Sequence, residues 1–290
     1  MKKTMNDIII FLCIILFIIF SILLIIANEF NFDNQIVREL KKNTVIVKDG
    51  KINKDNDNKL VFLTGKLDYN DQILHDDLCN FDIETPKLLR FVEVYQWDRY
   101  EEKDLNGNIS YKYYKKWSSE LIDSSKFNDH ENPTTKIAGT RYYYPDSIKV
   151  GEFKLSKKQK EMLENQNKLK ISDDFIIPDN YKVYKEYITN SNNPEEPEIG
   201  DNRISYYYND WENITILAKQ HKNSFKEHYL NDGNKINIIK KGILTFDEVI
   251  KPYKENSKFN KWVLRIVSII LLLFNINALI SLKRKNNHNL

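Results

Sequence analysis

Residues 90–117 read RFVEVYQWDRYEEKDLNGNISYKYYKKW, and aromatic and charged residues alternate along most of this stretch. A period of two is typical of a strand with one buried face, so we expect strands at Leu88–Tyr100 and Ile109–Trp117. Between them, Asn106-Gly107 predicts a hairpin with a type I′ turn, which needs a positive φ at both central residues. Neither face of the first strand is purely apolar: one carries Leu89, Phe91, Glu93, Tyr95 and Trp97, and the other carries Arg90, Val92, Val94 and Gln96.

The first apolar segment, Ile8 to Ala27, reads IIIFLCIILFIIFSILLIIA and contains no charge, Pro or Gly. As a helix, a segment of this length rises about 30 Å, which matches the thickness of a bilayer core. A cleaved secretory signal is the alternative, but the apolar core of a signal runs about 7–15 residues and ends in a small-x-small site. Ile25-Ile26-Ala27 fits that site poorly, so we predict an uncleaved transmembrane helix at residues 8–27.

A second apolar segment, at residues 262–282, reads IVSIILLLFNINALISL from Ile266 onward. The basic tripeptide KRK follows it as a stop signal, which favours a membrane span over a buried helix of a globular domain. Asn275 and Asn277 lie in the middle of this segment, and an amide in lipid gains from a hydrogen-bonding partner. We therefore expect both amides to contact the first helix or a neighbouring chain, and contact with a neighbouring copy would give a homo-oligomer.

Basic residues flank both segments: Lys2 and Lys3 precede the first, and Lys283-Arg284-Lys285 follows the second. Short basic flanks stay in the cytosol, so the tails at residues 1–7 and 283–290 are predicted to be cytoplasmic. Residues 28–261 then form an extracytoplasmic or luminal domain. The chain carries a net charge of +3, to which the tails contribute, so this domain is close to neutral. It lacks the excess of cations that binding to nucleic acid requires.

The domain between the apolar segments is predicted to be mainly β, with few helices. Ser156 is a candidate cap for a helix at Lys157–Lys170, and Thr245 for one that runs toward Lys251. The polar helix and the Pro-rich loop after it suggest a sub-boundary near residues 156–195. The predicted fold class is a membrane-anchored α+β protein, whose mainly β extracytoplasmic domain is flanked by N-terminal and C-terminal transmembrane helices. Further strands are expected at Leu60–Gly65, Gly139–Tyr144, Ser147–Leu155, Arg203–Tyr208, Ile214–Gln220 and Lys235–Lys241.

Familiar catalytic motifs are absent from the sequence, which has no HExxH, GxSxG, P-loop or GxGxxG pattern. The HDDLC stretch at residues 75–79 suggests metal binding, but its spacing matches no zinc site and is more typical of a solvated turn. Glu93 and Glu120 could form a carboxylate pair if both faced one site. The YYY runs at 142–144 and 206–208 could bind glycans or lipid headgroups, or could simply pack in strands. We predict no catalytic residue, no cofactor and no metal ligand.

The chain resembles the transmembrane protein 43 (LUMA) family from about residue 58 to residue 220, in the order and spacing of its motifs. The most specific of them combines VE-x-YQW with a downstream Trp and Asn-Pro. The matching residues are Asn58–Gly65 (NKLVFLTG), Leu89–Trp97 (LRFVEVYQW), Tyr111-x-Tyr113, Trp117, Ile122–Ser124, Phe127, Asn132-Pro133 and Pro197-Glu198-Ile199-Gly200-Asp201-x-Arg203.

The resemblance implies a membrane protein with an N-terminal span and a large luminal or extracytoplasmic domain. Animal members look like proteins of the endoplasmic reticulum and inner nuclear membrane that organise membrane complexes with lamins and emerin, and the family has no established catalytic residues to carry over. Members usually have several C-terminal spans, whereas this sequence shows one. Its richness in Ile, Asn and Lys suggests an AT-rich genome, and in a bacterium the nuclear partners would not exist.

The leading functional hypothesis is a non-enzymatic membrane scaffold that binds lipids and as yet unidentified proteins through the extracytoplasmic domain. The alternatives are an enzyme that acts on lipid headgroups or envelope glycans, and a sensor that needs a cytosolic partner. The expected location is the plasma (inner) membrane in a bacterium, and the endoplasmic reticulum or inner nuclear membrane in a eukaryote. Aromatic residues and Arg are enriched at interface hot spots, so the candidate partner surface comprises Arg90, Glu93, Tyr95, Trp97 and Trp117.

Overall fold

The computed structural model describes residues 5–31, 35–134, 138–172 and 175–288. The chain forms two compact units, of which the first holds the long apolar helices and the second holds most of the strands. The first unit comprises Met1–Val45, Tyr229–Ile236 and Leu244–Leu290, and the second comprises Ile46–His228 and Asn237–Ile243.

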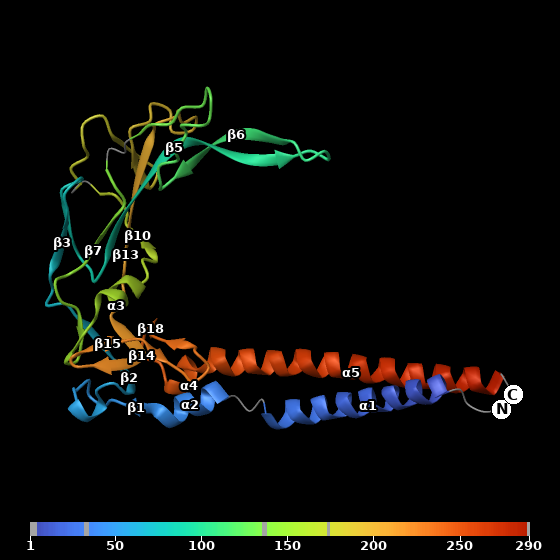
Figure 1. Cartoon of the computed structure of the whole chain (residues 1–290). Helices are drawn as coiled ribbons and strands as arrows, with labels where there is room; N and C mark the ends of the chain where they lie inside the picture. Colours follow the sequence, from blue (N-terminus) through green and yellow to red (C-terminus); the bar gives the residue numbers. More distant parts are fainter. Residues whose placement is uncertain (1–4, 32–34, 135–137, 173–174, 289–290) are drawn as a thin grey trace. The chain divides into compact units, whose positions relative to one another are not determined.

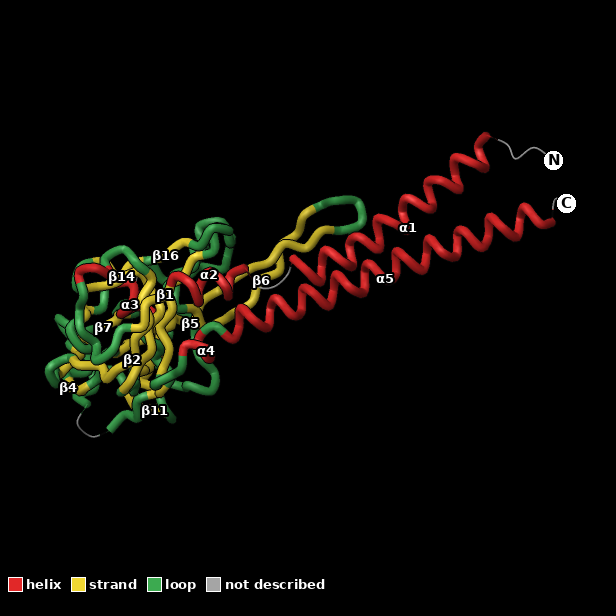
Figure 2. Tube along the Cα trace, turned by 90° about the horizontal axis from the view of Figure 1, so that it is seen from below, coloured by secondary structure: helices red, strands yellow, loops and turns green. Residues whose placement is uncertain are grey.

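Two long helices, α1 (Met5–Asn31) and α5 (Lys251–His288), lie side by side and run antiparallel (Figure 1, Figure 2). Their apolar windows, Ile9–Ile26 and Lys261–Ser281, are long and apolar enough to cross a bilayer, and each is only 6% buried. Both helices predicted from the apolar segments are therefore present, and both extend beyond the apolar run. Because the pair is antiparallel, the start of α1 and the end of α5 lie at the same end of it (Figure 1).

Small residues mark where α1 and α5 meet. Ser21 is 2% exposed and Ser268 is 3% exposed, whereas most apolar side chains on the same helices are exposed. Small side chains let two helix backbones approach closely, as is common between membrane helices. Asn275 donates its side-chain N–H to the Leu271 carbonyl of its own helix at 2.8 Å. A contact of Asn275 or Asn277 with another helix stays a prediction.

The first unit also contains shorter elements, which lie between α1 and α5 in the sequence. Thr245 caps α4 (Phe246–Val249) as predicted: the Glu248 N–H donates to the Thr245 Oγ1 at 3.3 Å, and the Thr245 N–H donates to the Glu248 carboxylate at 2.7 Å. This reciprocal pair satisfies two of the backbone donors that a helix start leaves open. The shorter elements are α2 (Gln35–Asn43), β17 (Lys235–Ile236) and α4, together with β1 (Thr44–Ile46) and β16 (His228–Tyr229), each of which has one residue in the second unit.

The second unit is built from antiparallel strands in two main sheets. One sheet has the order β15-β14-β2-β8-β9 with β18 beside β14, and the other has the order β11-β12-β13-β5-β6 with β10 beside β13 and β7 beside β5. A separate β3–β4 hairpin and the short helices η1 and α3 complete the described part of the unit. The bounds are η1 Lys54–Asn56, β2 Leu60–Asp68, β3 Ile73–Asp76, β4 Phe81–Glu84, β5 Leu88–Lys103, β6 Ile109–Ser118, β7 Arg141–Tyr143, β8 Lys149–Val150, β9 Phe153–Lys154, α3 Lys157–Met162, β10 Asn167–Lys168, β11 Lys182–Tyr184, β12 Tyr187–Thr189, β13 Asn202–Tyr208, β14 Asn213–His221, β15 Ser224–Lys226 and β18 Ile238–Lys241.

The centre of the first sheet is the pair β2 and β14, which aligns Leu63 with Ile216. Residues 60–63 and 214–218 are all buried, on both faces of their strands. A strand covered on both sides reads as a continuous apolar run rather than an alternating one. This explains why LVFL in β2 shows no alternation in the sequence.

In the second sheet, the alternating burial along β5 shows which side of the strand faces the core. From Leu88 to Trp97 the burial alternates strictly between buried and half-buried residues. The buried side includes Val92 and Val94, and also the polar Arg90 and Gln96. The predicted strand and its two faces are therefore confirmed, and the face that carries Arg90 is the one turned to the core.

The β5–β6 hairpin forms as predicted, but its turn is not type I′. Gly107 has φ +83°, whereas Asn106 is not among the residues with positive φ. The loop instead spans Asp104 to Asn108: the Asp104 N–H donates to the Asn108 carbonyl at 3.0 Å, and the Gly107 N–H donates to the Asp104 carbonyl at 3.0 Å. The Asp104 carboxylate accepts the N–H groups of Asn106 and Asn108 at 2.9 and 2.8 Å. This aspartate organises a longer loop, and only Gly107 needs a left-handed backbone.

The helix predicted at Lys157–Lys170 begins as expected and ends early. Ser156 and Gln159 form a capping box at its start. After Met162 the chain turns extended at Leu163, which is fully buried, and Asn167-Lys168 then pairs with β13 as β10. Burial of Leu163 and pairing with the sheet outweigh the weak helical preference of the Asn-rich stretch that follows.

The segment 156–195, where a sub-boundary was predicted, lies inside the second unit. It supplies the strands β10, β11 and β12 to the same sheet that contains β5 and β13. The sheet that positions the candidate site thus draws on residues from 88 to 208.

Candidate functional site

Four of the five predicted surface residues meet on one face of the β5–β6 hairpin. Glu93 lies opposite Arg203 in the ladder, and Tyr95 lies opposite Trp117. The Arg203 Nε donates to the Glu93 carboxylate at 2.6 Å, and the Arg203 guanidinium lies 4.5 Å from the centre of the Trp117 ring. The rings of Tyr95 and Trp117 are 5.2 Å apart. An ion pair, a cation–π contact and an aromatic pair therefore lock these side chains together.

Trp97 lies on the same face. A loop that was not predicted to contact it holds its backbone in place. The backbone N–H of Trp97 donates to the Asn132 Oδ1 at 2.6 Å, and the Asn132 Nδ2 donates to the Trp97 backbone carbonyl at 2.8 Å. The His130 ring lies edge-on to Trp97 at 4.4 Å and stacks on Tyr113 at 4.2 Å. Asn132 thus completes the backbone pairing of β5 from a loop, and the Asn-Pro of the sequence motif is the signal that marks it.

The aromatic face, which we define as Tyr95, Trp97, Tyr111, Tyr113 and Trp117, becomes more exposed along the hairpin. Tyr95, Trp97 and Trp117 at its base are half-buried. Farther out, Tyr111 is 42% exposed and Ile109 on the same side of β6 is 51% exposed. The hairpin reaches out beyond the rest of the second unit (Figure 1). Its base is therefore rigid, and its outer part presents apolar side chains to the surroundings.

Arg90, the fifth predicted residue, does not belong to this surface. It points to the other side of β5, where it is 6% exposed. The register of the sheet places Arg90 between Arg141 of β7 and Tyr206 of β13. The prediction that Arg90 faces a partner is therefore wrong, because residues at even and odd positions of a strand point to opposite sides.

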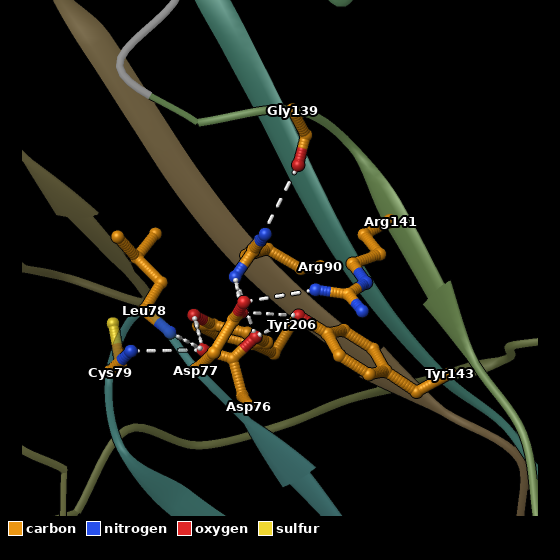
Figure 3. A network of polar contacts seen from close by, with 9 residues as sticks. All are labelled: Asp76, Asp77, Leu78, Cys79, Arg90, Gly139, Arg141, Tyr143 and Tyr206. Carbon is orange, nitrogen blue, oxygen red and sulfur yellow. Dashed lines mark hydrogen bonds and ion pairs between the residues drawn. The ribbon is translucent and has the colours of Figure 1, made fainter.

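Arg90 instead joins a buried network around Asp76, the last residue of β3 (Figure 3). The Arg90 Nη1 lies 3.0 Å from the Asp76 carboxylate and 2.7 Å from that of Asp77. The hydroxyl groups of Tyr143 and Tyr206 lie 2.7 and 2.8 Å from the Asp76 oxygens. Asp76 is 0% exposed, so these donors replace the hydrogen bonds to water that the carboxylate loses on burial.

The backbone of the same turn completes the shell of the Asp76 carboxylate. The N–H groups of Leu78 and Cys79 donate to its Oδ1 at 3.1 and 2.9 Å. The expectation of a solvated turn at residues 75–79 is therefore wrong for Asp76 and Cys79, both of which are fully buried. Among the residues that the structure describes, no group of three His, Cys, Asp or Glu side chains is placed to hold a metal ion.

The pKa values of the residues in the network indicate a structural role rather than a catalytic one. Hydrogen bonding from Arg90 lowers the pKa of Asp77 to about 2, so this carboxylate stays ionised. Burial raises the pKa of the Cys79 thiol, and burial also raises the pKa of Tyr143 and of Tyr206, whose hydroxyls face carboxylates. A thiol with a raised pKa is a poor nucleophile. The network holds the β3–β4 turn against the sheet.

The conceivable carboxylate pair of Glu93 and Glu120 does not form a site. Glu93 is held by Arg203, and Glu120 lies beyond the end of β6, where its backbone carbonyl accepts the Gln96 Nε2 at 2.9 Å. His75 bonds to Asp82 at 2.9 Å on the exposed β3–β4 hairpin. These groups are bound to separate neighbours, and their arrangement supplies no shared acid–base centre.

Comparison with known proteins places this architecture in a family. The model of the family described as Transmembrane protein 43 matches residues 94–285. Transmembrane protein 43 of Rattus norvegicus is 22% identical over 247 residues, and the match covers 78% of this chain and 61% of that protein. Transmembrane protein 43 of Homo sapiens is 23% identical over the same shares.

The chain therefore spans about 61% of the length of these curated relatives. Their names denote a membrane protein and do not name an enzyme. No solved structure matches the chain. Together with the two apolar helices, the family match identifies a membrane protein.

Proposed function

The chain belongs to the transmembrane protein 43 family, and from that premise we propose that it is a non-enzymatic membrane scaffold. In this proposal the two apolar helices anchor the second unit to a bilayer, and the aromatic face of the β5–β6 hairpin binds a protein partner. The observation that carries the proposal is the aromatic face itself, which is held in place at its base and exposed at Tyr111, with the exposed Ile109 on the same side of β6.

The contacts within the hairpin support a binding role. A pre-ordered aromatic surface loses little conformational entropy when it binds, and aromatic side chains contribute most to interface energies. Arg99 is centred 4.1 Å from the Tyr111 ring and donates to the Lys126 carbonyl at 2.8 Å. Tyr111 is therefore held in place while 42% of its surface stays exposed.

An enzymatic role gains no support from the arrangement of the candidate groups. Arg90 and Glu93 point to opposite sides of β5, and each is committed to an ion pair within the fold. Catalysis needs such groups to converge on one reacting atom. The geometry therefore favours the scaffold over an enzyme that acts on lipid headgroups or glycans.

The helix pair supports a topology with both tails on one side of the bilayer. α1 and α5 are antiparallel, so a pair that spans one bilayer leaves the tails on one side and the chain between the helices on the other. The basic residues that follow the apolar part of α5 favour the cytosol for the tails. The second unit then lies outside the cytosol, in the lumen or the extracytoplasmic space.

Site-specific photocrosslinking in living cells tests the partner surface. A benzophenone amino acid that replaces Tyr111 in the full-length protein is expected to capture a distinct partner protein. Tyr100, which is 53% exposed and points to the other side of the hairpin, is the matched control and is expected to capture little. Ile109→Glu, in the chain that carries the crosslinker at position 111, should abolish capture because it places a charge in an apolar contact.

Two outcomes would contradict the proposal. One is an equal yield at positions 111 and 100, which would indicate random collisions. The other is capture of only a second copy of the chain at position 111, because a surface occupied by self-association leaves no site for another protein.

A further inference from the structure

A basic groove lies on the second unit and shares no residue with the aromatic face. Its cavity volume is about 630 Å³, and it is lined by Tyr142, Tyr143 and Tyr144 together with residues at the end of β9 and in α3. This volume falls within the range of about 300–1,000 Å³ typical of small-molecule sites. The charged residues of its lining are Arg141, Lys154, Lys157 and Lys160 against the single carboxylate of Asp146.

Lys160 is the most constrained of these cations. Its Nζ donates to the carbonyls of Pro145 and Asp146 at 2.6 and 3.1 Å. An ammonium group has three N–H donors, so a third remains after these two bonds. Burial lowers the pKa of Lys160, and the charge of Lys154 lowers it further. Lys154 and Lys160 both line the groove and Asp146 partly offsets their charge, so an anion bound in the groove would be attracted by both ammonium groups.

A buried cation, Lys87, lies over the rings of two of these tyrosines. The Lys87 Nζ lies 5.0 Å from the Tyr142 ring centre and 5.7 Å from that of Tyr144. Lys87 is 5% exposed and donates to two backbone carbonyls, those of Glu161 at 2.8 Å and Leu163 at 2.5 Å. Its positive charge thus reaches the tyrosine wall of the groove, although the carboxylates of Glu161 and Glu164 partly offset it.

We propose that this groove binds a phosphate-bearing ligand. Lysine is a common phosphate binder because its ammonium acts as a point charge with several donors. Lys154 and Lys160 supply the charge together with Lys157, whose Nζ also lies 3.9 Å from the exposed Glu161 carboxylate. The Tyr142 and Tyr144 rings supply an apolar wall for the organic part of the ligand. The ligand is either a phospholipid headgroup or a free phosphorylated metabolite, since both present the same phosphate monoester or diester chemistry.

Binding assays on the full-length protein in neutral detergent test the proposal. The probes are inorganic phosphate, glycerol 3-phosphate and short-chain phosphatidic acid, measured by calorimetry at low and high salt. We expect saturable binding to one site that weakens as salt rises. Loss of one charge-assisted contact corresponds to an affinity loss of about tenfold or more, and Lys154→Gln is expected to show it.

Controls separate the groove from general surface charge. Lys59 and Lys240 are exposed lysines elsewhere on the second unit, and Lys59→Gln with Lys240→Gln should leave the affinity unchanged. Lys160→Gln is a second test, but it also removes bonds to Pro145 and Asp146, so Lys154→Gln, whose side chain is exposed, is the decisive variant.

The possible results divide clearly. Phosphatidic acid that binds far more tightly than glycerol 3-phosphate identifies a lipid headgroup, and similar affinities identify a free metabolite; both support the groove. The absence of saturable binding for all three probes overturns it, as does an equal loss in the Lys59→Gln, Lys240→Gln control. The groove shares no residue with the aromatic face, so its failure would leave the partner surface untouched, and failure of the partner surface would leave the groove untouched.

Discussion

Substitution of Arg90 by methionine is expected to destabilise the folded protein by about 3–5 kcal/mol, the cost of removing one partner from a buried ion pair. Asp76 would keep the N–H groups of Leu78 and Cys79 and the hydroxyls of Tyr143 and Tyr206, but it would lose its buried counter-charge. Urea unfolding of the full-length protein in mild detergent, followed by tryptophan fluorescence, measures the change.

The matched control is Arg141→Gln, which removes an exposed member of the same cluster. The Arg141 side chain is 54% exposed and lies 2.9 Å from Asp77. Exposed ion pairs contribute about 0–1 kcal/mol, so this variant should unfold almost as the natural protein does. Equal effects of Arg90→Met and Arg141→Gln would show that the network is not buried as described.

Substitution of Gly151 by valine is expected to cost about 2–5 kcal/mol, from a strained backbone and from overpacking. Gly151 has φ +58°, and a Cβ added to it would lie 2.4 Å from the Gly50 carbonyl oxygen and 2.7 Å from the Gly50 Cα. Both contacts are with backbone, so no side chain can rotate away to make room. The Glu152 N–H donates to the Gly50 carbonyl at 2.9 Å, so a shift of Gly50 would also break this bond.

Gly200→Ala separates backbone strain from steric contact. Gly200 has φ +97°, but a Cβ there meets nothing within 4 Å. This control should cost only the strain of a left-handed backbone, roughly 1–2 kcal/mol. If Gly151→Val were no worse than Gly200→Ala in the same unfolding experiment, the close approach of residues 50 and 151 would be contradicted.

Local patterns predicted much of the fold because they report local physics. The alternation in β5, the apolar run in β2 and the capping residues Ser156 and Thr245 each correspond to an element that forms where expected. Tertiary contacts decided the rest. The helix after Ser156 ends early because Leu163 is buried, and the hairpin turn is longer because Asp104 bonds to the N–H groups across it.

The candidate site was predicted only in part, and the reason differs from residue to residue. The misplacement of Arg90 was avoidable, because its even position already separates it from Glu93 and Tyr95 on the strand. The network itself was not foreseeable from spacing, since Asp76 and Tyr206 are 130 positions apart and meet only through the sheet register. The contact of Asn132 with Trp97 spans 35 positions from a loop, and no period in the sequence marks it.

Thiol labelling in sealed, right-side-out membranes tests the central claim, that two helices span one bilayer with the β-rich unit opposite both tails. The probe positions are Leu105→Cys at the fully exposed hairpin tip and Lys285→Cys in the basic tail, each in a Cys13→Ala background; Cys79 is fully buried and serves as the unreactive baseline. We expect an impermeant maleimide to modify Leu105→Cys at once and Lys285→Cys only after the membrane is opened. Modification of both positions in sealed membranes, or of Lys285→Cys alone, would contradict this topology.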